Sequence, residues 1–248
     1  MRKENALAKV KAVAHTFLVM DIQPTAHAPV VVSHPFTNSG FVGVRDVEGN
    51  LAIADLLNKP EDCCLWREQI GQYIDQADSA YQVFLLLNKP YMLTFLKYTA
   101  PSLSERDLGQ ILANAWILNE MLNKDPNISK RELVSLFRSV SPGYRMDEGE
   151  LRQDQELEDT VTVYRGVTSY NAKNIKALSW TLDRETAEWF AHRFGEEGTI
   201  YEAQVRKEHI LALFTGRNES EVIVDPRHLE QIKESPEPGL DMPMTSSA

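Results

Sequence analysis

An arginine stands among valines in an apolar stretch in the second half of the chain. Residues 160–167 read Thr-Val-Thr-Val-Tyr-Arg-Gly-Val, and a period of two puts Arg165 on one face with the three valines. Burying a guanidinium is costly unless it meets a carboxylate or an anion, and its planar fork suits a phosphate. Gly166 has no side chain, so a ligand could approach the backbone there. The alternative is a structural salt bridge at the end of a strand.

Two hydroxyls come next. Ser179 and Thr181 point the same way if this segment is extended, and together they can orient a carboxylate or a sugar hydroxyl. Asp183 is expected to cap a helix over residues 184–194, which Gly195 ends. The alternative for the two hydroxyls is that they only help to start this helix.

Two carboxylates precede a late apolar strand. Glu219 and Glu221 are in phase with each other, and Val222 and Val224 face the opposite side. Paired carboxylates can divide labour, one stabilising positive charge on a sugar carbon and the other assisting a nucleophile. The alternative is an exposed acidic turn before a strand.

The elements around these residues are expected to be mostly strands. The alternating or continuous apolar runs predict strands over Thr160–Val167, Thr199–Val205, Ile210–Phe214 and Glu221–Asp225. With one helix among them, this pattern favours an α+β fold over a doubly wound sheet.

A helical region precedes the strands, over residues 61–143. One long helix is expected from about residue 61 to the Asn-Lys-Pro at 88–90, with a stripe that runs from Trp66 to Leu85. A second begins after Ser104. A third begins at the capping sequence Ser129-Lys130-Arg131-Glu132 and is expected to end at Pro142-Gly143. Residues 144–158 are charge-rich and predict an exposed connection.

The two ends of the chain have other compositions. Residues 1–60 predict an N-terminal extension of unknown function, with an amphipathic helix over 4–20 and short strands after Pro29. The apolar run of the first 20 residues is interrupted and too short for a membrane span, which argues against a signal peptide. Residues 234–248 are rich in proline and predict a disordered tail.

Composition limits the function classes. The 248 residues carry a formal net charge of −10, so broad binding of nucleic acid is disfavoured without a local basic groove. The two cysteines, Cys63 and Cys64, are adjacent, which supports neither a disulfide framework nor a structural metal site. We expect a cytoplasmic protein without a metal cofactor.

The order of these motifs resembles the arginine-type mono-ADP-ribosyltransferases, which carry an Arg, a Ser-Thr-Ser-like segment and a Glu-x-Glu. The matching residues are Tyr164-Arg165-Gly166, Ser179-Trp180-Thr181 and Glu219-Ser220-Glu221-Val222-Ile223. Relatives of this kind include the binary actin-modifying clostridial toxins and the ADP-ribosyltransferases of T-even phages. The resemblance covers about residues 160–226. It implies a mixed β core over 160–233 with the helical lobe 61–143 before it, together one catalytic domain, 61–233.

The resemblance also implies roles in a reaction on NAD. Arg165, with Gly166 beside it, would hold the NAD phosphates. Ser179 would steady the catalytic glutamate and the cofactor. Glu221 would hydrogen-bond the ribose next to nicotinamide and stabilise the oxocarbenium-like state as nicotinamide leaves. Glu219 would orient an arginine acceptor and assist loss of its proton.

Other positions follow from the same resemblance. Thr181 is expected in the cofactor site, and Phe190 and Phe194 are candidates to pack against nicotinamide, although both also fit the buried stripe of their helix. Phe214 and Arg217 are expected in a loop that recognises the acceptor. Trp180 departs from the family pattern in the middle of the Ser-Thr-Ser segment.

The sequence therefore predicts an enzyme that cleaves NAD and transfers ADP-ribose to an acceptor macromolecule, with protein arginine favoured over nucleic acid. Three alternatives stay open: modification of nucleic acid, plain hydrolysis of NAD, and a catalytically silent binding module. The resemblance to phage enzymes and toxins also allows an antitoxin or inhibitor protein as a partner.

Overall fold

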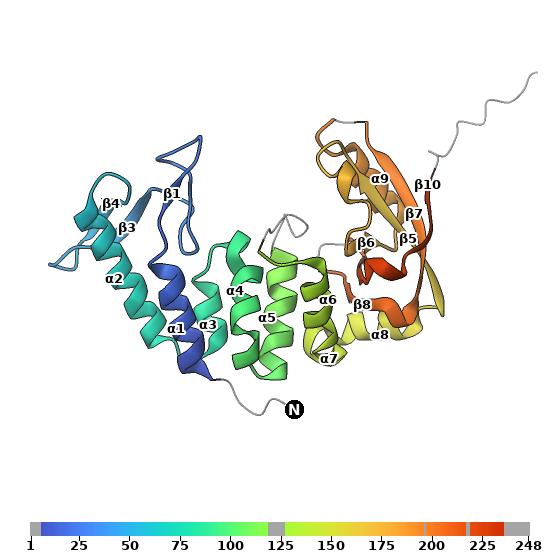
Figure 1. The fold of residues 1–248 in the computed structure, drawn as a ribbon, viewed down its shortest axis with the longest axis horizontal. Helices are drawn as coiled ribbons and strands as arrows, with labels where there is room; N and C mark the ends of the chain where they lie inside the picture. Colours follow the sequence, from blue (N-terminus) through green and yellow to red (C-terminus); the bar gives the residue numbers. More distant parts are fainter. Residues whose placement is uncertain (1–5, 119–126, 196, 217–218, 236–248) are drawn as a thin grey trace, which may run out of the picture. The chain divides into compact units, whose positions relative to one another are not determined.

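The computed structural model describes residues 6–118, 127–195, 197–216 and 219–235 (Figure 1). The chain divides into two compact units, Met1–Arg145 (unit 1) and Met146–Ala248 (unit 2). Within the described ranges, no helix is long and apolar enough to cross a bilayer. Most of the predicted tail lies outside the described residues, and so does the stretch 119–126.

Unit 1 is mainly helical, with two small hairpins near its start. Its helices are α1 (Leu7–Leu18), α2 (Pro60–Gln76), α3 (Ala80–Leu85), α4 (Met92–Thr99), α5 (Glu105–Leu118), α6 (Lys130–Arg138) and α7 (Pro142–Arg145). Its strands are β1 (Gln23–Pro24), β2 (Val32–Ser33), β3 (Phe41–Arg45) and β4 (Leu51–Asp55). β1 pairs with β2 and β3 pairs with β4, both antiparallel.

The first 60 residues share the core of these helices. The ring of Phe17 in α1 meets the ring of Phe95 in α4 edge-on, with centroids 5.2 Å apart, and Phe84 of α3 meets Phe95 at 4.9 Å. All three side chains are buried. The helical region 61–143 therefore clusters with residues 1–60, whereas the sequence grouped it with the later strands. The physical reason is that α1 buries its apolar stripe against α3 and α4.

The predicted long helix over 61–88 is two helices. α2 ends at Gln76, and Ser79 then caps α3 by accepting a hydrogen bond from the Gln82 amide at 3.2 Å. The break rotates the second helix, so Leu85, expected on the stripe with Trp66, is exposed. The predicted capping box at Ser129 and Glu132 is confirmed at the start of α6.

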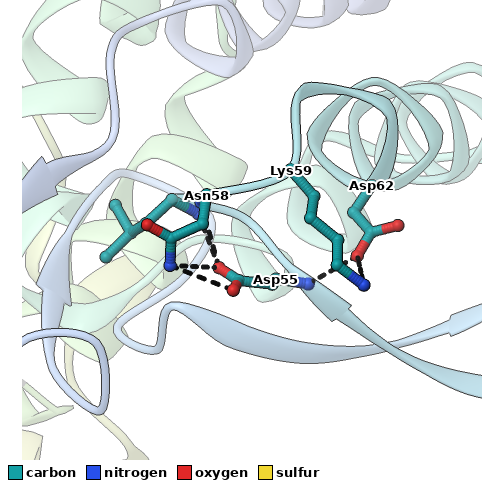
Figure 2. Close-up of polar contacts among 5 residues, drawn as sticks. Asp55, Asn58, Lys59 and Asp62 are labelled. Atoms are coloured by element: carbon teal, nitrogen blue, oxygen red, sulfur yellow. Dashed lines mark hydrogen bonds and ion pairs between the residues drawn. The ribbon is translucent and has the colours of Figure 1, made fainter.

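A network of short polar contacts fixes the junction between β4 and α2 (Figure 2). The Asp55 carboxylate accepts hydrogen bonds from the backbone and side-chain amides of Asn58 at 3.0–3.2 Å. Asp62, in the first turn of α2, accepts from the Asp55 amide at 2.8 Å. The hydrogen bonds from Asn58 lower the pKa of the Asp55 carboxyl. Lys59 provides no side-chain cap for α2, which begins at Pro60.

A buried histidine lies between the first hairpin and α2. His34 is fully buried, its ring meets that of Trp66 at 5.2 Å, and its Nδ1 accepts from the Phe36 amide at 3.1 Å. Burial, together with the nearby positive charge of Arg67, lowers the pKa of His34 from 6.5 to about 4. His34 is therefore neutral in the folded protein at neutral pH.

This pKa shift predicts acid destabilisation. Between pH 6.5 and 4 the unfolded chain binds a proton at His34 that the folded chain does not, so stability falls as the pH falls through this range. The loss is at most about 3 kcal/mol. Urea unfolding followed by far-UV circular dichroism at several pH values measures it. His34→Gln keeps an acceptor without a titrating ring, and an equally steep decline in that variant would contradict the assignment.

Unit 2 is built around a sheet. Its elements are α8 (Glu148–Glu156), β5 (Thr160–Val167), β6 (Ser179–Thr181), α9 (Arg184–His192), β7 (Thr199–Arg206), β8 (Ile210–Phe214), β9 (Glu221–Val224) and β10 (Glu230–Glu234). In the described part of this unit six strands form one antiparallel sheet in the order β10-β7-β5-β6-β9-β8. The expected α+β class is confirmed, and β10 is a strand that the sequence did not predict.

The stretch 144–158, predicted as an exposed connection, is largely helical. Asp147 and Glu150 form a capping box that begins α8, each side chain accepting from the other residue's backbone amide at 2.8 and 3.0 Å. Pro142 begins the short helix α7 instead of ending α6, since proline is tolerated in a first turn.

Helix α9 packs directly on β5, as Figure 1 shows. Asp183 caps it as predicted, by accepting from the amides of Glu185 and Thr186, and Gly195 follows with a φ of +70°. Ala187 and Ala191 are fully buried against Ile200 of β7. Small side chains on α9 thus let the helix lie close to the sheet.

Candidate functional site

Three neighbouring strands bring the predicted motifs together. Arg165 lies on β5, Ser179 on β6 and Glu221 on β9, and β6 pairs with both of the other strands. Thr181 is opposite Glu221 in this register, so Ser179, two residues away, shares the face of Glu221. Residues distant along the chain thereby meet at the centre of the sheet.

Ser179 connects the arginine and the glutamate. Its hydroxyl donates to Glu221 Oε1 at 2.5 Å, and its backbone carbonyl accepts from a terminal nitrogen of Arg165 at 2.6 Å. Ser179 and Glu221 are both half-buried. A hydroxyl that donates to a carboxylate fixes the carboxylate's position. The site thus holds a positioned anion beside a positioned cation.

The guanidinium of Arg165 is buried without being fully paired. Only 9% of the residue is exposed, and its Nε has no hydrogen-bond partner in the described part of the chain. Desolvation lowers the pKa of Arg165 to about 10, although the charge of Glu221 opposes this shift. Arg165 therefore stays charged at neutral pH and keeps hydrogen-bonding capacity for an anion.

A strained turn carries the Glu-x-Glu motif into β9. Ser220 has a φ of +42°, which is uncommon for a residue with a side chain. Thr181 Oγ1 donates to the Glu219 carbonyl at 2.6 Å, and the Leu182 amide donates to the Ser220 carbonyl at 3.0 Å. β6 thus holds the turn from one side.

These contacts correct the prediction for Thr181. The residue is 6% exposed, and its hydroxyl also accepts from the Asp183 amide at 3.1 Å. The hydroxyl is occupied by the turn and the start of α9, so the structure gives it a role in positioning Glu219.

Glu219 does not belong to the strand. The positive φ of Ser220 interrupts the period of two, so the predicted phase between Glu219 and Glu221 does not apply. The Glu219 side chain is half-exposed and has no partner among the residues that the structure describes.

Packing explains why residue 166 is a glycine, which the sequence did not reveal. A Cβ at this position would lie 2.2 Å from the Ala187 carbonyl oxygen and 2.5 Å from the Ala191 amide nitrogen, both in α9. The missing side chain makes room for a helix, not for a ligand. The glycine is thus explained by packing, and its contact with a cofactor stays a prediction.

The aromatic candidates on α9 lie partly at the surface. Phe190 is half-buried, and its ring meets the exposed Trp189 edge-on at 4.9 Å. The Arg193 guanidinium lies 5.8 Å from both ring centroids. Phe190 is thus outside the tightly packed stripe of Ala187 and Ala191. The Phe194 side chain lies outside the described atoms.

The two residues predicted to recognise the acceptor differ in outcome. Phe214 is the last residue of β8 and only 3% exposed, so it belongs to the core and cannot contact an acceptor. The strand predicted over Ile210–Phe214 is confirmed and includes this residue, so only its assignment to the acceptor loop fails. Arg217 lies outside the described residues.

Sequence reasoning missed Glu150. This carboxylate is 6% exposed and accepts from the Thr215 amide at 2.9 Å, at the start of the segment that leads to Glu219. The spacing Asp147-x-x-Glu150 is the capping-box signal that would have placed it at the start of a helix.

Among the described residues, no group of three or more His, Cys, Asp or Glu side chains could hold a metal ion. Comparisons of the chain with protein-family models, curated proteins and solved structures found no match.

Proposed function

We propose that this protein cleaves NAD at the bond to nicotinamide and transfers the ADP-ribosyl group to an arginine of an acceptor protein. One observation carries the proposal: the Ser179 hydroxyl fixes the Glu221 carboxylate at 2.5 Å, and the same serine binds Arg165 through its carbonyl. A fixed carboxylate and an incompletely paired guanidinium fit a substrate that has both a diphosphate and a sugar carbon that becomes positive.

The chemistry assigned to Glu221 is electrostatic. When the bond between the ribose carbon and the nicotinamide nitrogen breaks, nicotinamide takes the bonding electrons and the sugar carbon gains positive charge. Glu221 stabilises that charge, and Ser179 keeps its carboxylate in place. Arg165 holds the diphosphate, whose charge its buried guanidinium complements.

The choice of arginine as the acceptor is argued from Glu219. A protonated guanidinium is a poor nucleophile, so transfer to arginine requires loss of a proton as the new bond to the sugar carbon forms. Glu219, half-exposed and without a partner in the described ranges, accepts this proton. It stands two residues before Glu221, across the turn at Ser220.

Charge favours a protein acceptor over nucleic acid. Lys and Arg equal Asp and Glu in number over residues 1–145, so the whole net charge of −10 falls within residues 146–248, the unit that carries the site. Such a unit repels phosphate backbones and attracts basic protein surfaces.

The test uses purified full-length protein, NAD labelled in the adenine moiety, and a cell lysate as the source of acceptors. Nicotinamide release and label on protease-sensitive material are the expected results. Label that nuclease removes instead would identify a nucleic-acid acceptor. Nicotinamide release without any labelled macromolecule would identify a hydrolase. A protein that neither releases nicotinamide nor binds NAD would be a catalytically silent binding module.

Glu219→Gln should separate transfer from NAD cleavage. The change removes the base but keeps the size of the side chain, so transfer to arginine should fall by about 100-fold or more while nicotinamide release persists. Label incorporated into protein and free nicotinamide are measured in the same reaction. Unchanged transfer in this variant would show that the arginine assignment is incorrect.

A further inference from the structure

A carboxylate outside the three central strands is bonded to the segment that leads to Glu219. Glu150 of α8 accepts from the Thr215 amide through Oε1 at 2.9 Å and from the Asp147 amide through Oε2 at 3.0 Å. Thr215 is the first residue after β8. Both oxygens of one buried side chain are therefore used to hold backbone.

A second contact fixes the end of the same strand. Met146 Sδ accepts from the Leu213 amide at 3.1 Å, and the Met146 side chain is buried. Residues 146–150 thus hold the chain on both sides of Phe214, where β8 passes into the segment that precedes Glu219.

The far end of this segment is held from another element. Thr181 and Leu182 bind the carbonyls of Glu219 and Ser220. α8 therefore holds Thr215 at the end of β8, and residues 181–182 hold Glu219 and Ser220 at the start of β9. Burying a carboxylate costs desolvation, which its two hydrogen bonds to backbone amides offset.

We propose that Glu150 is a positioning residue for the acceptor step. By holding Thr215, next to the Phe214 that pairs with Glu221, it sets where Glu221 stands relative to the Glu219 carboxylate. It so decides whether the ADP-ribosyl group passes to arginine or to water. Glu150 acts through the backbone at Thr215 and touches neither NAD nor acceptor. The inference rests on the proposed function of Glu219.

Asp147 provides a matched control. Its side chain caps α8 by accepting from the Glu150 amide at 2.8 Å, but it makes no contact with Thr215. Asp147→Ala therefore weakens the start of α8 and leaves the bond to Thr215 in place. Glu150→Ala removes both. Glu150→Gln keeps the size of the side chain, but its single oxygen cannot serve both amides, so it gives a second variant if the alanine variant does not fold.

Two measurements on the full chain test the proposal. Hydrogen exchange at the Thr215 amide should accelerate by about tenfold or more in Glu150→Ala and Glu150→Gln, since a bond to a charged acceptor is lost, and should stay near the wild-type rate in Asp147→Ala. The ratio of ADP-ribose transferred to nicotinamide released should fall by about tenfold in the Glu150 variants alone, with nicotinamide release retained.

The possible failures are distinct. A wild-type protein that releases no nicotinamide overturns the proposed function, and the role of Glu150 with it. If the wild type releases nicotinamide and labels protein, an unchanged ratio in the Glu150 variants overturns the role of Glu150 alone. An equal fall in Asp147→Ala does the same, because it would show that only the stability of α8 matters.

Discussion

Glu221→Gln is expected to reduce nicotinamide release from NAD by about 1,000-fold, and transfer with it. Gln keeps a carbonyl oxygen that can accept from the Ser179 hydroxyl, so the hydrogen bond at 2.5 Å has a replacement and the sheet should fold. The variant loses the negative charge that we assign to stabilising the sugar carbon. Nicotinamide release over a range of NAD concentrations measures the effect.

Two controls make this result specific. The thermal midpoint of the Glu221→Gln variant should stay close to that of the wild type, and NAD binding should persist because Arg165 is unchanged. Glu219→Gln, two residues away in the same turn, should keep nicotinamide release. If Glu221→Gln released nicotinamide at the wild-type rate, the carboxylate would have no part in the cleavage.

Gly166→Ala is expected to destabilise unit 2 by about 3 kcal/mol or more, the largest folding effect that we anticipate from a single methyl group. The added Cβ would lie 2.2 Å and 2.5 Å from backbone atoms of α9, which cannot move aside as a flexible side chain can. Either α9 must shift away from β5 or the unit must unfold. Urea unfolding followed by the fluorescence of Trp180 and Trp189, the two tryptophans of this unit, measures the loss.

Gly43→Ala is the comparison. Gly43 also lies in a strand, β3, but a Cβ there would meet only the Leu51 side chain, at the ordinary distance of 3.6 Å. This variant should be close to the wild type in stability. If Gly166→Ala were equally harmless, α9 would not lie as close to β5 as the structure has it.

The chemistry-bearing residues could be predicted because each lies in a strong local pattern. The alternation over residues 160–167 and the apolar run after Glu221 gave strands, and Asp183 gave the start of α9. Only the family resemblance allowed us to expect contacts among Arg165, Ser179 and Glu221. Which strands pair is set by contacts distant along the chain, which no local period encodes.

The features that could not be predicted also depend on contacts between residues distant along the chain. Gly166 and Thr181 were predicted to face a ligand because their packing partners, the backbone of α9 and the Glu219 carbonyl, are distant along the chain. Phe214 was expected in the acceptor loop through the family resemblance, although the strand pattern over Ile210–Phe214 already placed it at the end of β8. The division of the chain was misplaced for a related reason, since nothing local shows that α1 packs with the helices that follow residue 60.

The position of α8 also decides where unit 2 can be separated from the rest of the chain. The strand pattern begins at Thr160, so an isolated fragment designed from the sequence would start there. Such a fragment would contain every strand of the sheet. It would lack Glu150, whose carboxylate accepts a hydrogen bond from the Thr215 amide, and Met146, whose sulfur accepts one from the Leu213 amide. A fragment meant to keep these two contacts therefore begins at or before Met146, the first residue of unit 2.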